Sequence, residues 1–209
     1  MRIIYLHGFA SGPNSRKAQY FRERFAAQGI RIEIPIMDQG DFHGLTITGQ
    51  LRLIENLAAG EPVRLIGSSM GGYLAALYAA LHPETERLVL LAPAFYFTER
   101  WPQSLGEAKV EAWKRMGSMP VFHYSENGMR EIGYQLVEDG AQYPAAPNFH
   151  QPALIFHGTQ DTVVPASYSE EFVASHPNAR LQLLDSGHEL NDCLDVIWTE
   201  SAGFLQPAL

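Results

Sequence analysis

Cysteine, positive charge and long apolar runs are all scarce in this sequence, and each scarcity excludes a class of protein. Cys193 is the only cysteine among 209 residues, which excludes an internal disulfide and a zinc site built on cysteines. Lysine and arginine number 15 against 23 acidic residues, so the formal net charge is −8 at pH 7. Because an acidic surface repels phosphate groups, we expect no nucleic-acid partner.

No stretch of the sequence is apolar enough to cross a membrane. One long uncharged stretch is 65–83, and the glycines and serines at 67–72 interrupt it. A membrane span needs about 20 mostly apolar residues. The apolar run at the N-terminus ends at Leu6, which is too short for the core of a signal peptide. We therefore expect a cytoplasmic protein with no membrane span.

What the sequence does contain is enough apolar residues for one core. Hydrophobic residues make up 46% of the chain and charged residues 18%, and the length suits a single domain over residues 1–209. Short runs rich in Val, Ile and Leu alternate with helical patterns, and such runs are typical of strands buried on both faces of a parallel sheet. The predicted strands are residues 2–6, 30–34, 63–66, 87–91, 153–156 and 180–184.

Helical patterns fill the intervals between these strands. Asn14 or Ser15 is the predicted cap of a helix that ends at Gln28, where Gly29 supplies the stop. The other predicted helices are residues 47–57, 70–81, 167–175 and 190–205. Strand and helix in alternation imply βαβ crossovers, so the sequence predicts a three-layer α/β fold with about six mainly parallel strands.

The alternation breaks once, between residues 93 and 151. Here the pattern predicts an amphipathic helix over 104–116 and then a hairpin that turns at Asn127-Gly128, because both residues tolerate positive φ. An insertion of this length is more often a functional cap or lid than an idle loop. Ten of the 23 aromatic residues fall in it. Most of these rings fit a small core within the insertion, and others fit the wall of a substrate pocket. The candidates for the pocket are Phe95, Trp101, Phe122 and Tyr124.

The segment Gly67-Ser68-Ser69-Met70-Gly71 matches the pattern G-x-S-x-G, centred on Ser69. A predicted strand runs into it and a helix of small residues runs out, which is the setting of a nucleophile elbow. Glycines at 67 and 71 let the neighbouring backbone pass close to a strained turn, and the helix N-terminus favours developing negative charge. The alternative interpretation is a glycine-rich turn with an incidental serine.

A serine hydroxyl needs a base, and the base needs a carboxylate to orient it. His188 follows the predicted strand 180–184, and Asp161 follows the predicted strand 153–156. The chain order Ser69, Asp161, His188 is the order expected for this architecture, and all three residues lie just beyond strand ends. Asp185 and Glu99 are weaker rivals for the carboxylate.

The remaining histidines and the cysteine fit structural roles better than catalytic ones. His7 and His157 each end a strand before a glycine and are expected to support loops, whereas His123 and His150 are expected at the surface. Cys193 is expected to be a buried apolar thiol. No spacing of His, Asp or Glu suggests a metal site, and no phosphate-binding glycine loop is present.

On these motifs the sequence resembles the α/β-hydrolase superfamily, in particular small bacterial esterases and acyl-protein thioesterases. Leu6-His7-Gly8-Phe9 is similar to the family's oxyanion loop. The resemblance implies that the backbone N–H groups of Phe9 and Met70 form the oxyanion hole. The chain begins at what would be the third strand of the family, so the usual N-terminal antiparallel hairpin is expected to be missing.

The reaction implied is hydrolysis of a small-molecule ester or thioester through an acyl-enzyme, with no cofactor. Carbon–carbon bond hydrolases and peptidases share the same three catalytic groups and stay open, as does a protein that binds a small ligand without turnover. A dehalogenase is disfavoured because it would need an aspartate at the elbow. Neither the acyl length nor the oligomeric state follows from the sequence.

Overall fold

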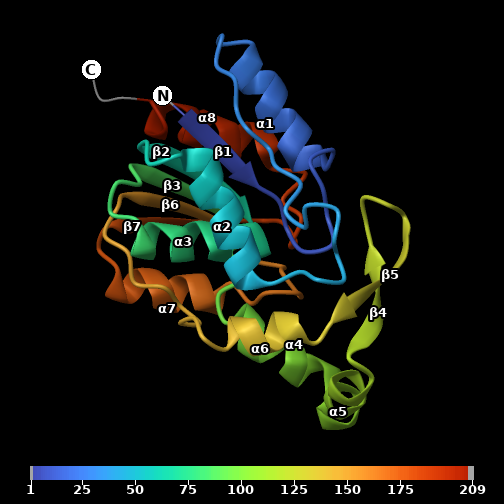
Figure 1. Cartoon of the computed structure of the whole chain (residues 1–209). Coiled ribbons are helices and arrows are strands. Elements are labelled where there is room, and N and C mark those ends of the chain that lie inside the picture. The colour runs from blue at the N-terminus through green and yellow to red at the C-terminus, as the bar shows by residue number, and fades with distance from the viewer. Residues whose placement is uncertain (1, 207–209) are drawn as a thin grey trace.

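A computed structural model describes residues 2–206, and its centre is a parallel β-sheet (Figure 1). Residue 1 and residues 207–209 of the expected domain 1–209 lie outside the described part. The sheet has the strand order β1-β2-β3-β6-β7, and every neighbouring pair is parallel. Its strands are β1 (Arg2–Leu6), β2 (Val63–Ser68), β3 (Arg87–Leu91), β6 (Ala153–Gly158) and β7 (Ala179–Leu184). All five carboxyl ends therefore meet at one edge of the sheet.

Helices cover both faces of the sheet, as the alternating pattern predicts (Figure 1). On one face lie α1 (Arg16–Ala26) and α8 (Leu194–Phe204), and on the other lie α2 (Ile47–Ala58), α3 (Met70–Leu81) and α7 (Ser167–Ser175). Leu88 and Leu90 of β3 point to the second face, whereas Val89 and Leu91 point to the first. This alternation gives two apolar layers, and the three-layer α/β prediction is confirmed.

The predicted strand at residues 30–34 does not form, so the sheet described within residues 2–206 has five strands where about six were predicted. Only an isolated parallel bridge joins Ile4 to Glu33. The Glu33 N–H donates to Ile3 O at 2.9 Å, and the Tyr5 N–H donates to Glu33 O at 2.8 Å. Pro35 follows directly and has no N–H to continue the ladder, which explains why pairing stops there.

Two predicted helices are shorter in the structure. The first ends at Ala26, and Ser15 occupies its N-cap position without a side-chain capping bond. The last helix begins at Leu194 and not at residue 190, because Leu190 has a φ of 53° and so cannot lie within a helix.

The insertion at residues 93–151 contains two helices, a hairpin and a third helix. They are α4 (Phe97–Leu105), α5 (Glu107–Met116), β4 (Ser118–His123), β5 (Gly128–Gly133) and α6 (Gln135–Gly140). The prediction of a single helix over 104–116 is wrong. Gly106 has a φ of 80° and separates α4, which ends at Leu105, from α5. The hairpin is confirmed with a wider loop: His123 pairs with Gly128, and Asn127 adopts a φ of 50°.

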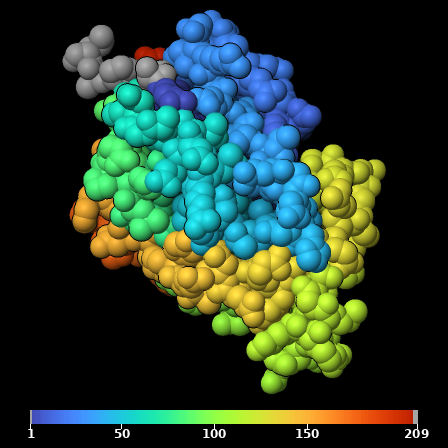
Figure 2. All heavy atoms as spheres, viewed as in Figure 1, coloured from blue at the N-terminus to red at the C-terminus, as the bar shows by residue number. Residues whose placement is uncertain are grey.

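The hairpin stands at the carboxyl edge of the sheet, toward which the arrow of β1 points (Figure 1). Its atoms, yellow in Figure 2, lie against the light-blue segment that follows residue 34. The Gly133 N–H donates to His43 O at 3.1 Å, and the Tyr124 N–H donates to Ala10 O at 2.7 Å. The insertion is thus hydrogen-bonded to the loops that follow β1.

Candidate active site

Ser69 sits on a strained turn between β2 and α3. Its φ of 54° and ψ of −118° are unfavourable for any residue with a side chain. A Cβ added to Gly67 would lie 2.3 Å from Gly71 O, and a Cβ added to Gly71 would lie 2.1 Å from Leu6 O. Only glycine fits at these two positions, which is the steric condition that the sequence predicts for an elbow.

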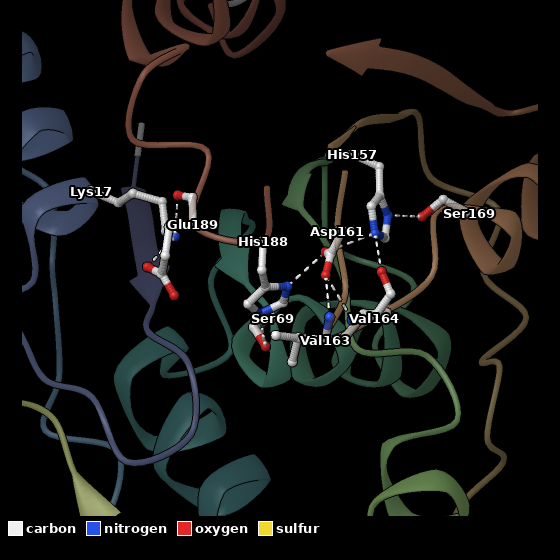
Figure 3. A network of polar contacts seen from close by, with 9 residues as sticks. All are labelled: Lys17, Ser69, His157, Asp161, Val163, Val164, Ser169, His188 and Glu189. Atoms are coloured by element: carbon white, nitrogen blue, oxygen red, sulfur yellow. Dashed lines mark hydrogen bonds and ion pairs between the residues drawn. The ribbon is translucent and has the colours of Figure 1, made fainter. Parts of the chain in front are cut away.

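The hydroxyl, imidazole and carboxylate that the sequence singles out lie in one hydrogen-bonded line (Figure 3). Ser69 Oγ donates to His188 Nε2 at 3.0 Å, and His188 Nδ1 donates to Asp161 Oδ2 at 2.7 Å. Ser69 comes from the elbow, Asp161 from the loop after β6 and His188 from the loop after β7. In this arrangement the imidazole can accept a proton from Ser69 while its other nitrogen stays fixed.

Asp161 is held ionised by its surroundings. Its side chain is 0% exposed, and its Oδ1 accepts the N–H groups of Val163 and Val164, each at 2.8 Å. Burial by itself raises the pKa of Asp161, but hydrogen bonds from His157, His188 and Val164 outweigh it, so the pKa lies well below its usual range. A stable negative charge therefore faces the His188 ring.

The ring of His157 contacts the Asp161 carboxylate and helps to hold it in place. The ring is fully buried, and its Nε2 lies 2.8 Å from Val164 O and 3.2 Å from Asp161 Oδ2. Its Nδ1 lies 2.7 Å from Ser169 Oγ on α7. With its ring nitrogens engaged by these groups, His157 supports the loop, as the sequence predicts.

The backbone N–H groups of Phe9 and Met70 are the donors predicted for the oxyanion hole, and they lie in the loop after β1 and directly after Ser69. A Cβ added to Gly8 would lie 3.4 Å from Ser69 Cβ, so the loop after β1 runs directly beside the serine. Within residues 2–206, neither N–H donates to a protein acceptor. Met70 is also the first residue of α3, where the helix dipole favours negative charge.

A cavity of about 890 Å³ opens over Ser69 and His188. Aromatic side chains of the loop after β1 and of the insertion line one part of the cavity, called here the apolar wall. Polar side chains line another part, the polar wall: Lys17, His188, Glu189 and Asn191. All four aromatic residues predicted for the pocket lie on its lining: Phe95, Trp101, Phe122 and Tyr124. The side chain of Phe95 is buried and stacks on Phe172 at 4.4 Å between centroids, whereas Tyr124 is 73% exposed at the mouth.

Several side chains on the lining were not predicted from the sequence. Those of Phe9 and Phe97 belong to the apolar wall, and those of Lys17 and Asn191 belong to the polar wall. Phe97 lies in the aromatic-rich insertion, which was the one available signal. Lys17 gave none, because a lysine in an amphipathic helix is usually a surface residue.

His123 is not at the surface, which corrects the sequence prediction. It is 3% exposed, and its ring packs edge-on against Phe42 at 4.7 Å between centroids. Its Nε2 lies 3.8 Å from Asp38 Oδ2. The loop that carries Phe42 and Asp38 covers the inner face of β4, an arrangement that no local pattern signals. His150 is exposed, as predicted.

His7 supports its loop, as expected. It is buried, its Nε2 accepts the Met37 N–H at 3.3 Å, and its Nδ1 lies 3.0 Å from Gly8 O. Burial lowers the pKa of His7, which favours the neutral ring. Cys193 is half-buried beside the apolar layer and not fully buried as predicted. Burial raises the pKa of its thiol, and the charge of Asp192 acts in the same direction.

The rival carboxylates lie away from the imidazole. Asp185 accepts a hydrogen bond from Gln160 at 2.6 Å, and Glu99 is exposed on α4. In the described part of the chain, no group of three or more His, Cys, Asp or Glu side chains could hold a metal ion. None of the helices described over 2–206 is long and apolar enough to cross a bilayer.

The sheet, the elbow and the crossovers define this chain as an α/β-hydrolase. Solved structures agree: mouse alpha/beta hydrolase domain-containing protein 10 superposes with a TM-score of 0.79 at 19% identity, over 97% of this chain and 88% of that one. The chain belongs to the uncharacterised protein family UPF0227, whose model matches residues 2–202.

Two curated relatives match most of the chain. The mitochondrial palmitoyl-protein thioesterase ABHD10 of Pongo abelii is 29% identical over 180 residues, 78% of this chain and 58% of that protein. The human monoacylglycerol lipase ABHD6 is 25% identical over 190 residues, 70% of this chain and 56% of that protein. The chain thus spans little more than half the length of these relatives.

Proposed function

We propose that the protein is a serine hydrolase that cleaves carboxylic esters or thioesters through Ser69, His188 and Asp161. The observation that carries this proposal is the pair of hydrogen bonds, 3.0 Å and 2.7 Å, that joins the three side chains beside an open cavity. The thioesterase and lipase named among the relatives support the same class of reaction.

In the first half of the proposed reaction, the acyl group moves to the enzyme. Ser69 Oγ attacks the carbonyl carbon while His188 Nε2 takes the hydroxyl proton, and the Asp161 carboxylate stabilises the imidazolium that forms. The tetrahedral oxygen faces the N–H groups of Phe9 and Met70, and one such donor is worth about 2.7–4 kcal/mol of the barrier. The C–O or C–S bond then breaks as His188 returns the proton to the alcohol or thiol.

In the second half, water releases the acid. His188 takes a proton from a water molecule, the hydroxide attacks the acyl carbon, and the proton returns to Ser69 as the ester bond to the enzyme breaks. Side chains carry every proton transfer, so the scheme needs no cofactor.

The insertion at 93–151 is the proposed cap over this site. Its aromatic residues Phe95, Trp101, Phe122 and Tyr124 would bind the acyl part of a small-molecule ester or thioester, because apolar walls favour apolar groups. The size of the cavity, about 890 Å³, is in the range of sites for small molecules.

A fluorophosphonate probe and a substrate series test the proposal together. We expect the probe to label Ser69 in the wild type and to leave Ser69→Ala unlabelled, with turnover lower by about 10⁶-fold in that variant. p-Nitrophenyl esters of increasing chain length, beside matched acyl thioesters, would identify the substrate class. Retained ester hydrolysis in Ser69→Ala would refute the assignment.

Other outcomes separate the alternatives. Labelling of Ser69 without turnover of either series would favour a carbon–carbon bond hydrolase or a peptidase, which use the same three groups. Absence of labelling, together with measurable binding of an apolar ligand, would indicate a protein that binds without turnover.

A further inference from the structure

Lys17 of α1 is a buried cation on the polar wall of the cavity. Its side chain is 9% exposed, and its Nζ donates to the backbone carbonyl of Glu189 at 2.6 Å. A longer contact of 3.3 Å joins Nζ to the Glu189 carboxylate, which is 72% exposed. Because a buried ammonium is costly without close acceptors, the carbonyl is the partner that fixes its position.

That carbonyl belongs to the residue directly after His188. The loop between β7 and α8, residues 185–193, has no regular secondary structure to hold it in place. Figure 3 shows His188 between two contacts: Asp161 holds its ring on one side, and Lys17 holds the backbone at Glu189 on the other. The two contacts come from different elements, so together they restrain both the ring and the chain that carries it.

Side chains other than Lys17 dock α1 on the rest of the domain. Phe21 and Phe25 of the same helix are buried against the sheet and pack on Trp198 of α8, with centroids 6.1 Å and 4.8 Å away. Tyr20 and Arg24 also hydrogen-bond to Asp195 of α8. A lysine is therefore not needed to attach the helix, and its burial at the cavity calls for another explanation.

Electrostatics agree with a role beside the base. Burial lowers the pKa of Lys17, and the carboxylates of Glu189 and Asp161 oppose that change by favouring the ammonium form.

We propose that Lys17 is a positioning residue, which holds the Glu189 carbonyl and so places His188 between Ser69 and Asp161. The proposal rests on the proposed function. It assigns Lys17 no contact with the reacting atoms. A loop displaced by about 1 Å is enough to lower catalysis about 100-fold, so one anchor next to the base has a measurable effect.

The test compares Lys17→Met and Lys17→Gln with Arg24→Met in the full chain. Lys17→Met removes the charge and the donors, Lys17→Gln removes the charge but keeps an amide donor, and Arg24→Met removes an exposed cation from the same helix. We expect kcat to fall about 10- to 100-fold in Lys17→Met with KM within about threefold, and to fall less in Lys17→Gln. Arg24→Met should keep the wild-type values.

The split between kcat and KM separates positioning from a merely structural role. A merely structural role would lower the fraction of folded enzyme and leave kcat per folded molecule unchanged, whereas displacement of His188 lowers kcat per folded molecule with KM nearly constant. The folded fraction is measured by thermal unfolding, and Arg24→Met should keep the wild-type value of both quantities.

Three outcomes would overturn the proposal. The first is a Lys17→Met enzyme with wild-type kcat. The second is loss of the thermal unfolding transition in both Lys17 variants, which would assign Lys17 to the stability of α1. The third is an equal rate of Ser69 labelling by a fluorophosphonate in the wild type and in Lys17→Met, which contradicts the role of Lys17 but not the proposed function. An unlabelled wild type would contradict the proposed function itself.

Discussion

The two walls of the cavity are held by different kinds of interaction. At and behind the polar wall, single hydrogen bonds of 2.6–3.0 Å join polar atoms, and each atom has one or two defined partners. At the apolar wall, aromatic rings pack on one another: the ring of Phe9 lies 5.5 Å from Phe42 and 4.8 Å from Trp101, and Trp101 lies 5.2 Å from Trp113.

This difference indicates that the two walls have different roles: one fixes the positions of atoms, and the other sets the shape of the pocket. A hydrogen bond fixes two atoms to within a few tenths of an ångström and is lost completely when one of them is removed. Aromatic packing spreads its energy over many weak contacts, so it defines the shape of a surface more than the position of an atom. We therefore expect changes on the polar wall to lower kcat and changes on the aromatic wall to alter KM and chain-length preference.

The largest expected effect is that of Asp161→Asn, behind the polar wall. The amide would present a donor to His188 Nδ1 and so favour the wrong tautomer, and kcat should fall about 10⁴-fold, measured with a p-nitrophenyl ester. Asp185→Asn is the matched control, because Asp185 bonds to Gln160 and not to His188. A loss of less than tenfold in Asp161→Asn would mean that the carboxylate does not orient the base.

Trp101→Ala on the aromatic wall should have a smaller and different effect. Trp101 packs on Phe9, Phe97 and Trp113, so its loss widens the apolar wall. We expect KM for a long-chain p-nitrophenyl ester to rise about tenfold, while kcat for p-nitrophenyl acetate stays within about threefold of the wild-type value. Met116→Ala, at an exposed position of the same insertion, should change neither value. An equal loss for short and long esters would contradict the division between the walls.

The dependence of stability on pH separates the contribution of the Asp161 charge from a contribution of packing. The pKa of Asp161 in the folded protein lies below the value of about 3.9 expected when unfolded, so its charge stabilises the fold above that pH, and the contribution is lost as the pH falls. Asp161→Asn should lower the free energy of unfolding by about 2 kcal/mol at pH 7. Urea titrations from pH 7 to pH 3 should show this deficit shrinking. A deficit that stays constant over that range would assign it to packing and not to the charge.

The sequence predicted those parts of the molecule whose structure is determined by residues close together in the chain. All five sheet strands and the helices α3 and α7 follow from short apolar runs and periodicity, and the elbow follows from two glycines that steric contact requires. Ser69, Asp161 and His188 each follow a predicted strand. Since parallel strands end at one edge of the sheet, a position directly after a strand was enough to predict that all three residues lie at that edge.

What the sequence could not predict depends on contacts between distant segments. Lys17 lies 172 residues from Glu189, and nothing in its helix distinguishes it from a solvated lysine. The burial of His123 depends on the loop that carries Phe42 and Asp38, which has no regular secondary structure. Gly106 could have predicted the end of a helix, because glycine often follows a helix C-terminus, but the amphipathic pattern continues across it.

The smallest expected effect is that of Tyr124→Ala at the mouth of the cavity. The ring is 73% exposed and contacts Phe122 edge-on at 5.3 Å, while the backbone N–H that binds Ala10 O is unaffected by the substitution. The ratio of kcat/KM for long over short esters should change by no more than about threefold, and the melting temperature should stay within about 2 °C. A uniform tenfold loss of kcat would show that the hairpin helps to position the oxyanion loop through Ala10. In that case the aromatic wall would also act on atomic positions, and the division between the two walls would not hold.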